Sequence, residues 1–348
     1  MSMTTAQHAA VFRGVEEALS YEQVFFVGFD SRGSRSLLRA ALACMQTITE
    51  LFPKFRFEAT LGLDNHYGLM KSGYLRASDV FNPVLPVGAV LRSLLANRRT
   101  HRTVDSVDLV SQRWRGRDAP ISARFGNAPS GMTSVGRRYP TQLYLHLCPA
   151  ACATQAERCR ELVERTAAAV VRRGGCEHAF VDVADDREAA GWTTYIGVSM
   201  VEGSRSLQQR VHMEAGSRCH GKVRGVYWGM LFLPAMLGTW DGDGSYRTLF
   251  DRWVVKARAA GEAAQRRIDA GQGTREDWLA VEDVPYRISY PTAKGEACLF
   301  CFSQTPLTWT ALSRVTDPLS GFGMKHFRGN MALAVEMHKR LRQRGVLL

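Results

Sequence analysis

The sequence predicts an α+β protein with mixed or antiparallel sheets, helices packed on one face of the sheet, and either one unit or two similar α/β halves. Short runs rich in β-branched and aromatic residues alternate with longer segments in which apolar residues recur every three or four positions. Strand, helix and strand follow one another twice, an order typical of a helix layer on a sheet. No fixed period repeats along the 348 residues, which argues against solenoids and propellers.

The first strand–helix–strand unit covers residues 21–58. Its strands are expected at 24–29 ("VFFVGF") and 54–60 ("KFRFEAT"), on either side of a helix within 34–52. Serines before this helix and a proline just after it mark its ends. The helix has one predicted buried face, formed by Leu37, Leu38, Ala41, Met45, Ile48, Leu51 and Phe52.

A middle region of glycine- and proline-containing loops follows. We expect a short helix near residues 88–99 and a strand near residues 108–114. The segment 113–138 ("RWRGRDAPISARFGNAPSGMTSVGRR") is rich in arginine and turn-forming residues and lacks a long period. It is therefore predicted to form surface loops.

The second unit begins with a strand at 142–148 ("QLYLHLC") and continues with a helix at about 154–173. Two glycines end this helix, and the strand "HAFVDV" at 178–183 follows it. The apolar stripe of the helix comprises Ala156, Cys159, Leu162, Val163, Thr166, Ala167 and Val170. Such a stripe indicates that the helix packs on the sheet.

The remaining sequence predicts two further helices and two strands. A long amphipathic helix is expected at 245–271, and its inward positions include leucine, tryptophan and valine. Two strands follow at 286–290 ("YRISY") and 297–303 ("ACLFCFS"). A closing helix is expected within 327–345.

The segment 225–240 contains sixteen residues without a charge, in a chain of net charge +12. A membrane-spanning helix needs roughly 20 apolar residues, and Pro234 and three glycines interrupt this run. Because buried strands are unbroken apolar runs, we predict a buried strand or turn followed by a packed apolar loop. The sequence therefore predicts no membrane partner.

The amino-terminal sequence "MSMTTAQHAA" lacks the features of a secretory signal, so the protein is expected in the cytoplasm with its eight cysteines reduced. Two pairs, Cys148 with Cys152 and Cys298 with Cys301, have spacings that zinc ligands also use. The second pair lies in an expected strand, where residues three apart point to opposite faces. Buried thiols are the favoured interpretation, and no metal site is predicted.

The positive charge is concentrated in two stretches. Residues 90–140 contain ten arginines against three aspartates, and residues 324–348 contain six basic residues against one glutamate. These excesses of seven and five equal the whole net charge of +12. Guanidinium groups bind carboxylates and phosphates bidentately, which favours an acidic partner. A solvated basic face without a specific partner is the alternative.

The sequence contains no motif that defines a catalytic or cofactor site. The glycines after the first strand lack the Gly-x-Gly-x-x-Gly spacing and the lysine of a P-loop, and no Gly-x-Ser-x-Gly elbow occurs. Asp241 and Asp243 alternate as in a calcium loop, but the third acidic position and the closing glutamate are missing. A turn with helix-capping groups ahead of Tyr246 is favoured. We therefore predict no cofactor, no metal and no catalytic residue.

Four features follow one another in residues 123–348. The strand and helix in "YPTQLYLHLCPAACATQAERCRELVERTAAAV" precede "HAFVDV". Next comes "GKVRGVYWGMLFLPAML", and later "VPYRISYPTAKGEACLFCFSQ" and "MALAVEMHKRLRQRG". These features resemble the immunity proteins of bacterial type VI secretion toxin systems, a family long known only as a domain of unknown function. The third is similar to the family's Arg-Gly-x-x-Trp-x-x-x-Leu-x-x-x-x-Leu segment, through Arg224, Gly225, Trp228 and Leu237.

We interpret this segment as structural. Gly225 and Gly229 permit close backbone approach around the bulky Tyr227 and Trp228, and the leucines that follow fill the core. The first half of the chain cannot be matched to the family residue by residue. Its arginine-rich segment is longer and more basic than the family's general pattern.

The resemblance implies a single immunity-type domain over residues 1–348, or two subdomains: an N-terminal α/β half at 1–122 and a C-terminal half at 123–348. It implies a cytoplasmic antitoxin that binds a cognate secreted effector, such as a nuclease, and neutralises it stoichiometrically without catalysis. The alternatives are a nucleic-acid-binding or regulatory protein, which a pI of about 9.6 permits, and an uncharacterised enzyme.

Arginine and aromatic side chains are the usual anchors of tight protein interfaces. The arginine-rich segment supplies both types within a few residues. If the effector is a nuclease, the metal-binding carboxylates of its active site are an acidic target for them. The predicted partner-binding residues are Arg113, Trp114, Arg115, Arg117, Arg137 and Arg138.

Overall fold

The computed structural model describes the two strand–helix–strand units and most of the C-terminal third of the chain. All structural statements below concern these residues. They are 22–30, 36–63, 75–76, 86–96, 104–111, 121–126, 141–147, 156–173, 178–185, 228–304, 315–316, 325–326 and 331–345.

The described strands form one antiparallel sheet of ten strands, in the order β3-β2-β4-β5-β6-β1-β7-β8-β10-β9. A separate pair is formed by β11 (Val315–Thr316) and β12 (Lys325–His326). This architecture confirms the predicted α+β class. The ten strands are β1 (Glu22–Asp30), β2 (Phe57–Leu63), β3 (Leu75–Arg76), β4 (Val104–Ser111), β5 (Ile121–Gly126), β6 (Thr141–Leu147), β7 (His178–Asp185), β8 (Gly229–Phe232), β9 (Tyr286–Thr292) and β10 (Gly295–Cys301).

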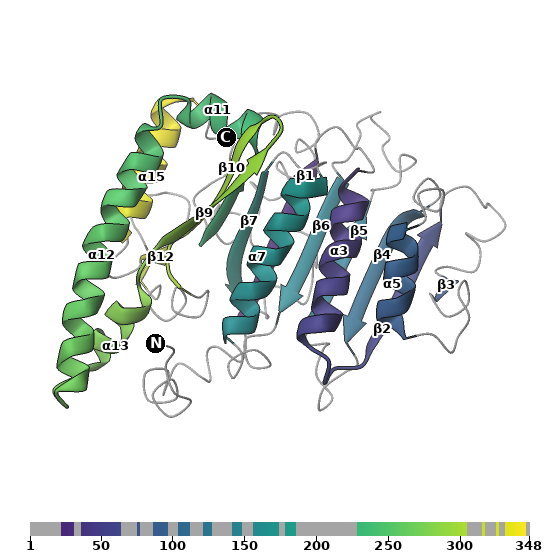
Figure 1. Cartoon of the computed structure of the whole chain (residues 1–348), viewed down its shortest axis with the longest axis horizontal. Helices are drawn as coiled ribbons and strands as arrows, with labels where there is room; N and C mark the ends of the chain where they lie inside the picture. Colours follow the sequence, from purple (N-terminus) through teal and green to yellow (C-terminus); the bar gives the residue numbers. More distant parts are fainter. Residues whose placement is uncertain are drawn as a thin grey trace.

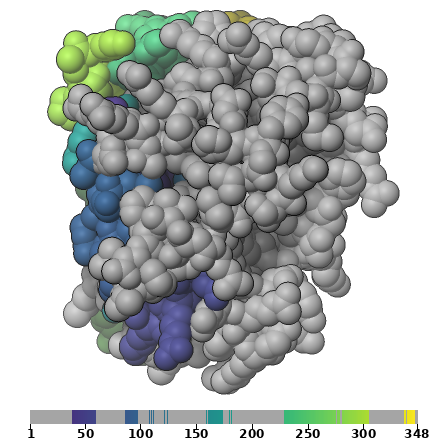
Figure 2. All heavy atoms as spheres, turned by 90° about the vertical axis from the view of Figure 1, so that its right-hand side faces the viewer, coloured from purple at the N-terminus to yellow at the C-terminus, as the bar shows by residue number. Residues whose placement is uncertain are grey.

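Two groups of helices accompany the sheet (Figure 1). The first group lies side by side along one face and comprises α3 (Ser36–Leu51), α5 (Val87–Ala96) and α7 (Ala156–Arg173). In Figure 2, which views the molecule from the β3 edge, α5 appears in blue on the helix-covered side. The second group lies at the β8–β9 end and comprises α11 (Pro234–Asp241), α12 (Ser245–Asp269), α13 (Arg275–Glu282) and α15 (Met331–Gln343).

The strand register explains why the first helix layer extends along the whole sheet. Directly paired residues of antiparallel strands share a face. One such row crosses all ten strands and contains only apolar residues and glycine: Leu75, Leu61, Val107, Phe125, Leu143, Gly28, Ala179, Leu231, Leu299 and Ile288. On the same face of β9, the Tyr290 hydroxyl donates to the Glu164 carbonyl of α7 at 3.4 Å. This is therefore the face that carries α7.

On the opposite face, the residues change from polar to apolar along the sheet. One row there begins with polar residues on β3, β2, β4, β5 and β6, which are Arg76, Thr60, Asp108, Arg124 and Tyr144. It continues with apolar residues on β1, β7, β8 and β10, which are Val27, Phe180, Met230 and Phe300. The second helix group packs at the apolar end of this row. Among the described elements, the second hydrophobic layer therefore lies at one end of the sheet.

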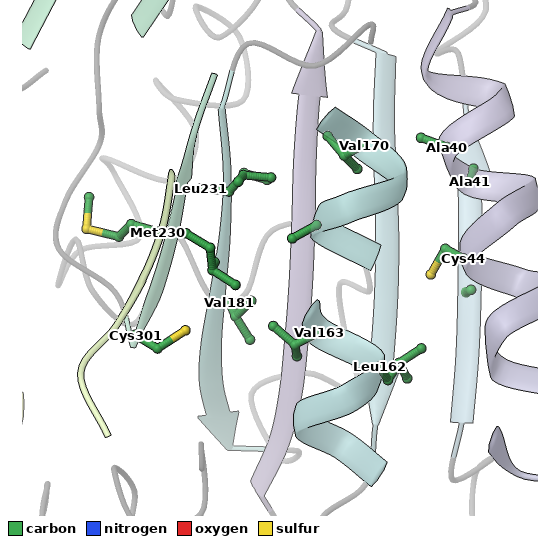
Figure 3. Close-up of a cluster of buried hydrophobic side chains, with 14 of the residues drawn as sticks. Ala40, Ala41, Cys44, Leu162, Val163, Val170, Val181, Met230, Leu231 and Cys301 are labelled. Carbon is green, nitrogen blue, oxygen red and sulfur yellow. The ribbon is translucent and has the colours of Figure 1, made fainter. Parts of the chain in front are cut away.

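The first layer packs through small and branched side chains. Leu38, Ala41 and Met45 of α3 are fully buried, as the predicted stripe requires. On α7, Leu162, Val163 and Val170 are fully buried and lie over the strands (Figure 3). The Thr166 hydroxyl donates to the Cys44 thiol at 3.3 Å, which joins the two helices inside the core.

The second layer packs through an aromatic cluster centred on Phe300 of β10. The Phe300 ring lies 5.0 Å from Phe250 and 5.2 Å from Tyr246, both on α12. It also lies 5.8 Å from Trp240 of α11 and 6.2 Å from Phe232 of β8. The contacts of Phe300 with Phe250, Tyr246 and Phe232 are edge-to-face, and such contacts add to the free energy gained from burial. The β9–β10 hairpin is therefore enclosed between α7 on one face and α11 and α12 on the other.

The sheet joins the two halves suggested by the sequence. The boundary between residues 122 and 123 falls inside β5. In addition, β1 pairs with β6 on one side and with β7 on the other. The described strands of both suggested halves therefore share one sheet.

The structure corrects two sequence-based predictions. Residues 121–126, predicted as a surface loop, form the central strand β5, in which Ile121 and Ala123 are buried. The segment after β8, predicted as a packed loop, is the helix α11, which begins at Pro234. Proline is favourable in the first turn of a helix, where its missing N–H would have no partner. Met236, Leu237 and Trp240 then fall on one buried helix face.

None of the helices in the described ranges is long and apolar enough to cross a membrane.

Two glycines test the packing of β8 and α11. A Cβ atom at Gly229 would lie 3.3 Å from the Cβ of Val181 on β7, whereas a Cβ at Gly238 would have no atom within 4 Å. Gly229→Ala should lower the free energy of unfolding by about 1–3 kcal/mol through overpacking. Gly238→Ala, within α11, should raise it by about 0.5–1 kcal/mol. Urea unfolding of both variants checks this, and equal effects would contradict the described packing of β8.

Candidate functional site

The predicted partner-binding residues lie outside the described residues. Arg113, Trp114, Arg115 and Arg117 belong to the connection between β4 and β5, and Arg137 and Arg138 to the connection between β5 and β6. Because β5 is antiparallel to both neighbours, the strand ends that flank these two connections lie at opposite ends of β5. Their joint role in partner binding stays a prediction.

The motif that carries the family resemblance is only partly described. Arg224, Gly225 and Tyr227 lie outside the described residues, whereas Trp228 and Gly229 lie at the start of β8. Trp228 is fully buried, and its indole Nε1 donates to the Ser303 hydroxyl at 2.8 Å. Its carbonyl accepts the N–H of Phe302 at 2.9 Å. The described part of the motif therefore joins β8 to the end of β10.

A buried carboxylate connects α11 to α12. Asp241 accepts the backbone N–H of Tyr246 at 2.6 Å and of Arg247 at 3.3 Å, and it also accepts the Arg247 Nε–H at 2.9 Å. These bonds confirm the predicted helix-capping turn. The Arg247 guanidinium also binds Glu296 at the start of β10. A hydrogen bond from Ser289, followed by the Arg247 charge, lowers the pKa of Glu296.

A second arginine–aspartate pair lies beside the first. Arg344, just beyond α15, donates to the Asp243 carboxylate at 2.9 Å, to the Ser245 hydroxyl at 3.0 Å and to the Trp240 carbonyl at 2.6 Å. The backbone N–H and hydroxyl of Ser245, together with Arg344, lower the pKa of Asp243 to about 2. The pair therefore fastens the C-terminal helix to the turn between α11 and α12.

A polar cluster lies between α7 and β9. The Arg160 guanidinium stacks 4.2 Å from the centre of the Tyr286 ring, and its Nε–H donates to Glu164 at 2.7 Å. It also binds the amide oxygen of Gln304. Burial raises the pKa of the Tyr286 hydroxyl well above its ordinary value. Tyr286 is therefore a neutral side chain that packs α7 against the edge of the sheet.

The register places Cys298 and Cys301 on opposite faces of β10, as predicted. Cys298 pairs with Phe232 and Ser289, and Cys301 pairs with Gly229 and Tyr286. One metal ion therefore cannot bind both thiols while β10 persists. Burial raises the pKa of Cys298 to about 12 and that of Cys301 further, so both thiols are protonated at neutral pH. Cys148 and Cys152 lie outside the described residues, within which no cluster of three metal-binding side chains occurs.

Some of these contacts could be predicted from the sequence and others could not. The capping role of Asp241 and Asp243 is predictable because both lie directly before a long amphipathic helix. The pairing of Arg344 with Asp243 joins residues 101 positions apart, and the stacking of Arg160 on Tyr286 joins α7 to β9, which are distant in the sequence. No local pattern in the sequence indicates these two contacts.

Comparison with known proteins gives little further information. No protein-family model and no curated protein matches the chain. A solved structure that resembles it is the Pseudomonas aeruginosa T6SS protein PA0821, where T6SS denotes the type VI secretion system. The two share 11% sequence identity over 92% of this chain and 81% of that one, with a TM-score of 0.42. At this level of similarity the likeness supports no conclusion about function.

The buried hydrogen bond of the family motif can be tested directly. Ser303→Ala should leave the Trp228 indole N–H without its acceptor and lower the free energy of unfolding by about 1–3 kcal/mol. Thr239→Ala is the matched control, since its hydroxyl is exposed and bonds to a carbonyl of its own helix. The control should change stability by less than about 0.5 kcal/mol. Similar urea midpoints for the two variants would contradict the role given to Ser303.

The Asp243–Arg344 pair should make stability dependent on pH. Because the pKa of Asp243 is lowered to about 2 in the folded state, its contribution is present above the unfolded pKa of about 3.9 and is lost as the pH falls toward 2. Asp243→Asn should therefore lose less stability than the wild type on acidification from neutral pH. Urea midpoints measured across this range check the difference, with Glu262→Gln on α12 as a control. If the urea midpoints of the wild type and Asp243→Asn change in parallel with pH, the Asp243–Arg344 pair does not make the predicted contribution to stability.

Proposed function

We propose that this protein is an immunity protein that binds a cognate type VI secretion effector and neutralises it. The observation that carries the proposal is the segment from Arg224 to Leu237, which resembles the characteristic segment of such immunity proteins. Its described part lies in the core, where Trp228 and Gly229 join β8 to its neighbours. A core motif of this kind supports a shared scaffold, while the partner-binding surface differs from one protein to another.

Stoichiometric neutralisation requires a rigid, complementary surface. A tight protein interface buries about 1,600 Å² and gains affinity when its groups are already ordered before binding. A ten-stranded sheet with a helix layer along one face supplies such a scaffold. In this proposal the protein acts by occupying the effector, and its own side chains carry out no reaction.

The arginine-rich connections are the proposed anchors. Arg113, Arg115 and Arg117 alternate along the segment between β4 and β5, with Trp114 among them. Guanidinium groups bind carboxylates bidentately and in a fixed geometry. An effector that acts as a nuclease offers clustered carboxylates at its metal site, so these arginines would block that site on binding.

Charge reversal tests this assignment. Arg113→Glu, Arg115→Glu and Arg117→Glu, combined in one variant, should weaken binding to the secreted protein encoded by the neighbouring gene by at least ~100-fold, because hot-spot arginines contribute several kcal/mol together. The matched control reverses three exposed arginines of the described residues, Arg56, Arg172 and Arg173. The measurements are isothermal titration and protection of cells that express the toxin.

The outcomes separate the candidate functions. Wild-type binding and protection with a defective triple variant support both the function and the anchors. If the triple variant and the control bind with equal affinity, the three arginines are not the anchors, but the proposed function stands. A wild type that neither binds nor protects would discard the function. The net charge of +12 also favours a nucleic-acid-binding protein, and duplex DNA binding that falls steeply with salt would support that alternative.

A further inference from the structure

The helix α12 presents one continuous exposed face. Tyr246, Phe250, Gly261 and Ala264 form its buried side. A helix repeats every 3.6 residues, so the residues opposite this side form a second stripe. We call this stripe the α12 outer face, and all of its six members are exposed: Arg252, Val255, Lys256, Ala259, Glu262 and Arg266. In Figure 1, α12 runs along one margin of the molecule, beyond the edge strand β9.

The cations of this face are not neutralised within the described part of the chain. Arg247 and Arg267 of the same helix pair with Asp241 and Asp277. By contrast, the guanidinium groups of Arg252 and Arg266 have no hydrogen bond or ion pair to any described residue. The same holds for Arg258, which lies at the border of the face. Among the described residues, these guanidinium groups therefore have no carboxylate partner.

The centre of the α12 outer face is apolar. Val255 is 68% exposed, and no other large hydrophobic residue whose burial is described is classed as exposed. Ala259 lies one turn further along, and Arg252 and Arg266 lie near the two ends. A small apolar centre within a charged border is the usual composition of a protein interface. A valine contributes less to helix stability than an alanine or a lysine at the same place, so its exposure has no local benefit.

The face is also held rigidly. Asp241 caps the start of α12, and Asp251 accepts two hydrogen bonds from Arg287 of β9, at 2.7 Å and 2.9 Å. At Gly261 the helix approaches α13 so closely that a Cβ would lie 3.3 Å from the Ala280 carbonyl. These contacts fix both the position and the rotation of α12. Little backbone conformational entropy would be lost when a partner binds.

We propose that the α12 outer face is a docking surface for an acidic protein partner. This inference rests on the proposed function, since the partner is the effector, and it adds a surface far from the arginine-rich connections in the sequence. Carboxylates of the effector bind Arg252 and Arg266, while an apolar side chain covers Val255. The Lys256 ammonium, 4.8 Å from the Trp253 ring centre, borders the contact.

Charge complementarity favours this occupant over two others. A second copy of the chain would bring the same cations together, which costs free energy through repulsion. A phosphate backbone would pair with the guanidinium groups but would leave Val255 without an apolar partner. An acidic protein surface with an apolar centre pairs with Arg252 and Arg266 and also covers Val255.

The test compares two double variants of the full-length chain. Arg252→Glu with Arg266→Glu changes the α12 outer face, and Arg172→Glu with Arg173→Glu changes two exposed residues at the end of α7. Both pairs alter the net charge equally, and all four positions are exposed. The ligand is the purified secreted protein encoded by the neighbouring gene, and the measurements are its Kd and the far-UV circular dichroism of each variant.

We expect the α12 variant to bind at least ~10-fold more weakly and the α7 variant to change by less than ~2-fold, with both remaining folded. Val255→Glu, which removes no cation, should also weaken binding. If the wild type binds and the α12 variants bind equally well, the docking surface is wrong while the proposed function stands. If the wild type does not bind, the proposed function fails and the surface assignment fails with it. Loss of duplex DNA binding at unchanged effector affinity would assign the face to nucleic acid and overturn the proposal.

Discussion

The burial of β10 on both faces is the constraint on which the rest of the described structure depends. Its fully buried residues form an unbroken run: Ala297, Cys298, Leu299, Phe300 and Cys301. Because successive residues of a strand point to opposite faces, such a run requires a hydrophobic layer on each side. On one face α7 contacts the paired strand β9, and on the other face α11 and α12 contact Phe300 of β10. Two helix groups that are distant in sequence are thereby fixed to each other through the β9–β10 hairpin.

This double burial also determines where charged groups lie. Charges are excluded from the middle of β10, so the ion pairs form at its start and on the edge strand. Glu296 there binds Arg247, and Arg287 of β9 binds Asp251. Both pairs end on α12, one turn apart, and therefore set the rotation of that helix about its axis. The residues opposite Phe250, including Val255, are consequently directed away from the sheet.

The sequence predicted long periodic elements better than short ones. The stripes of α3, α7 and α12 and the strands β1, β7, β9 and β10 are recognisable because their apolar spacing extends over many residues. The six-residue strand β5 carries an arginine and lies within a segment rich in turn formers, so its alternation was too short to outweigh its composition. For the candidate site, the caps of α12 were predictable, whereas Arg344 and Arg160 find their partners only in the folded chain. The arginine-rich connections lie outside the described residues.

The arginines of α12 show why exposed charge argues for a partner. Arg247 and Arg267 bind carboxylates that also cap helices, so each has a structural role. Arg252, Arg258 and Arg266 have no such role within the described part of the chain. Glu262 lies one turn from Arg258 and one turn from Arg266, but an exposed ion pair on a helix would contribute at most about 1 kcal/mol. These arginines therefore add little to the free energy of folding. They add more to the free energy of binding, because a guanidinium group attracts a carboxylate more strongly at a desolvated interface than in water.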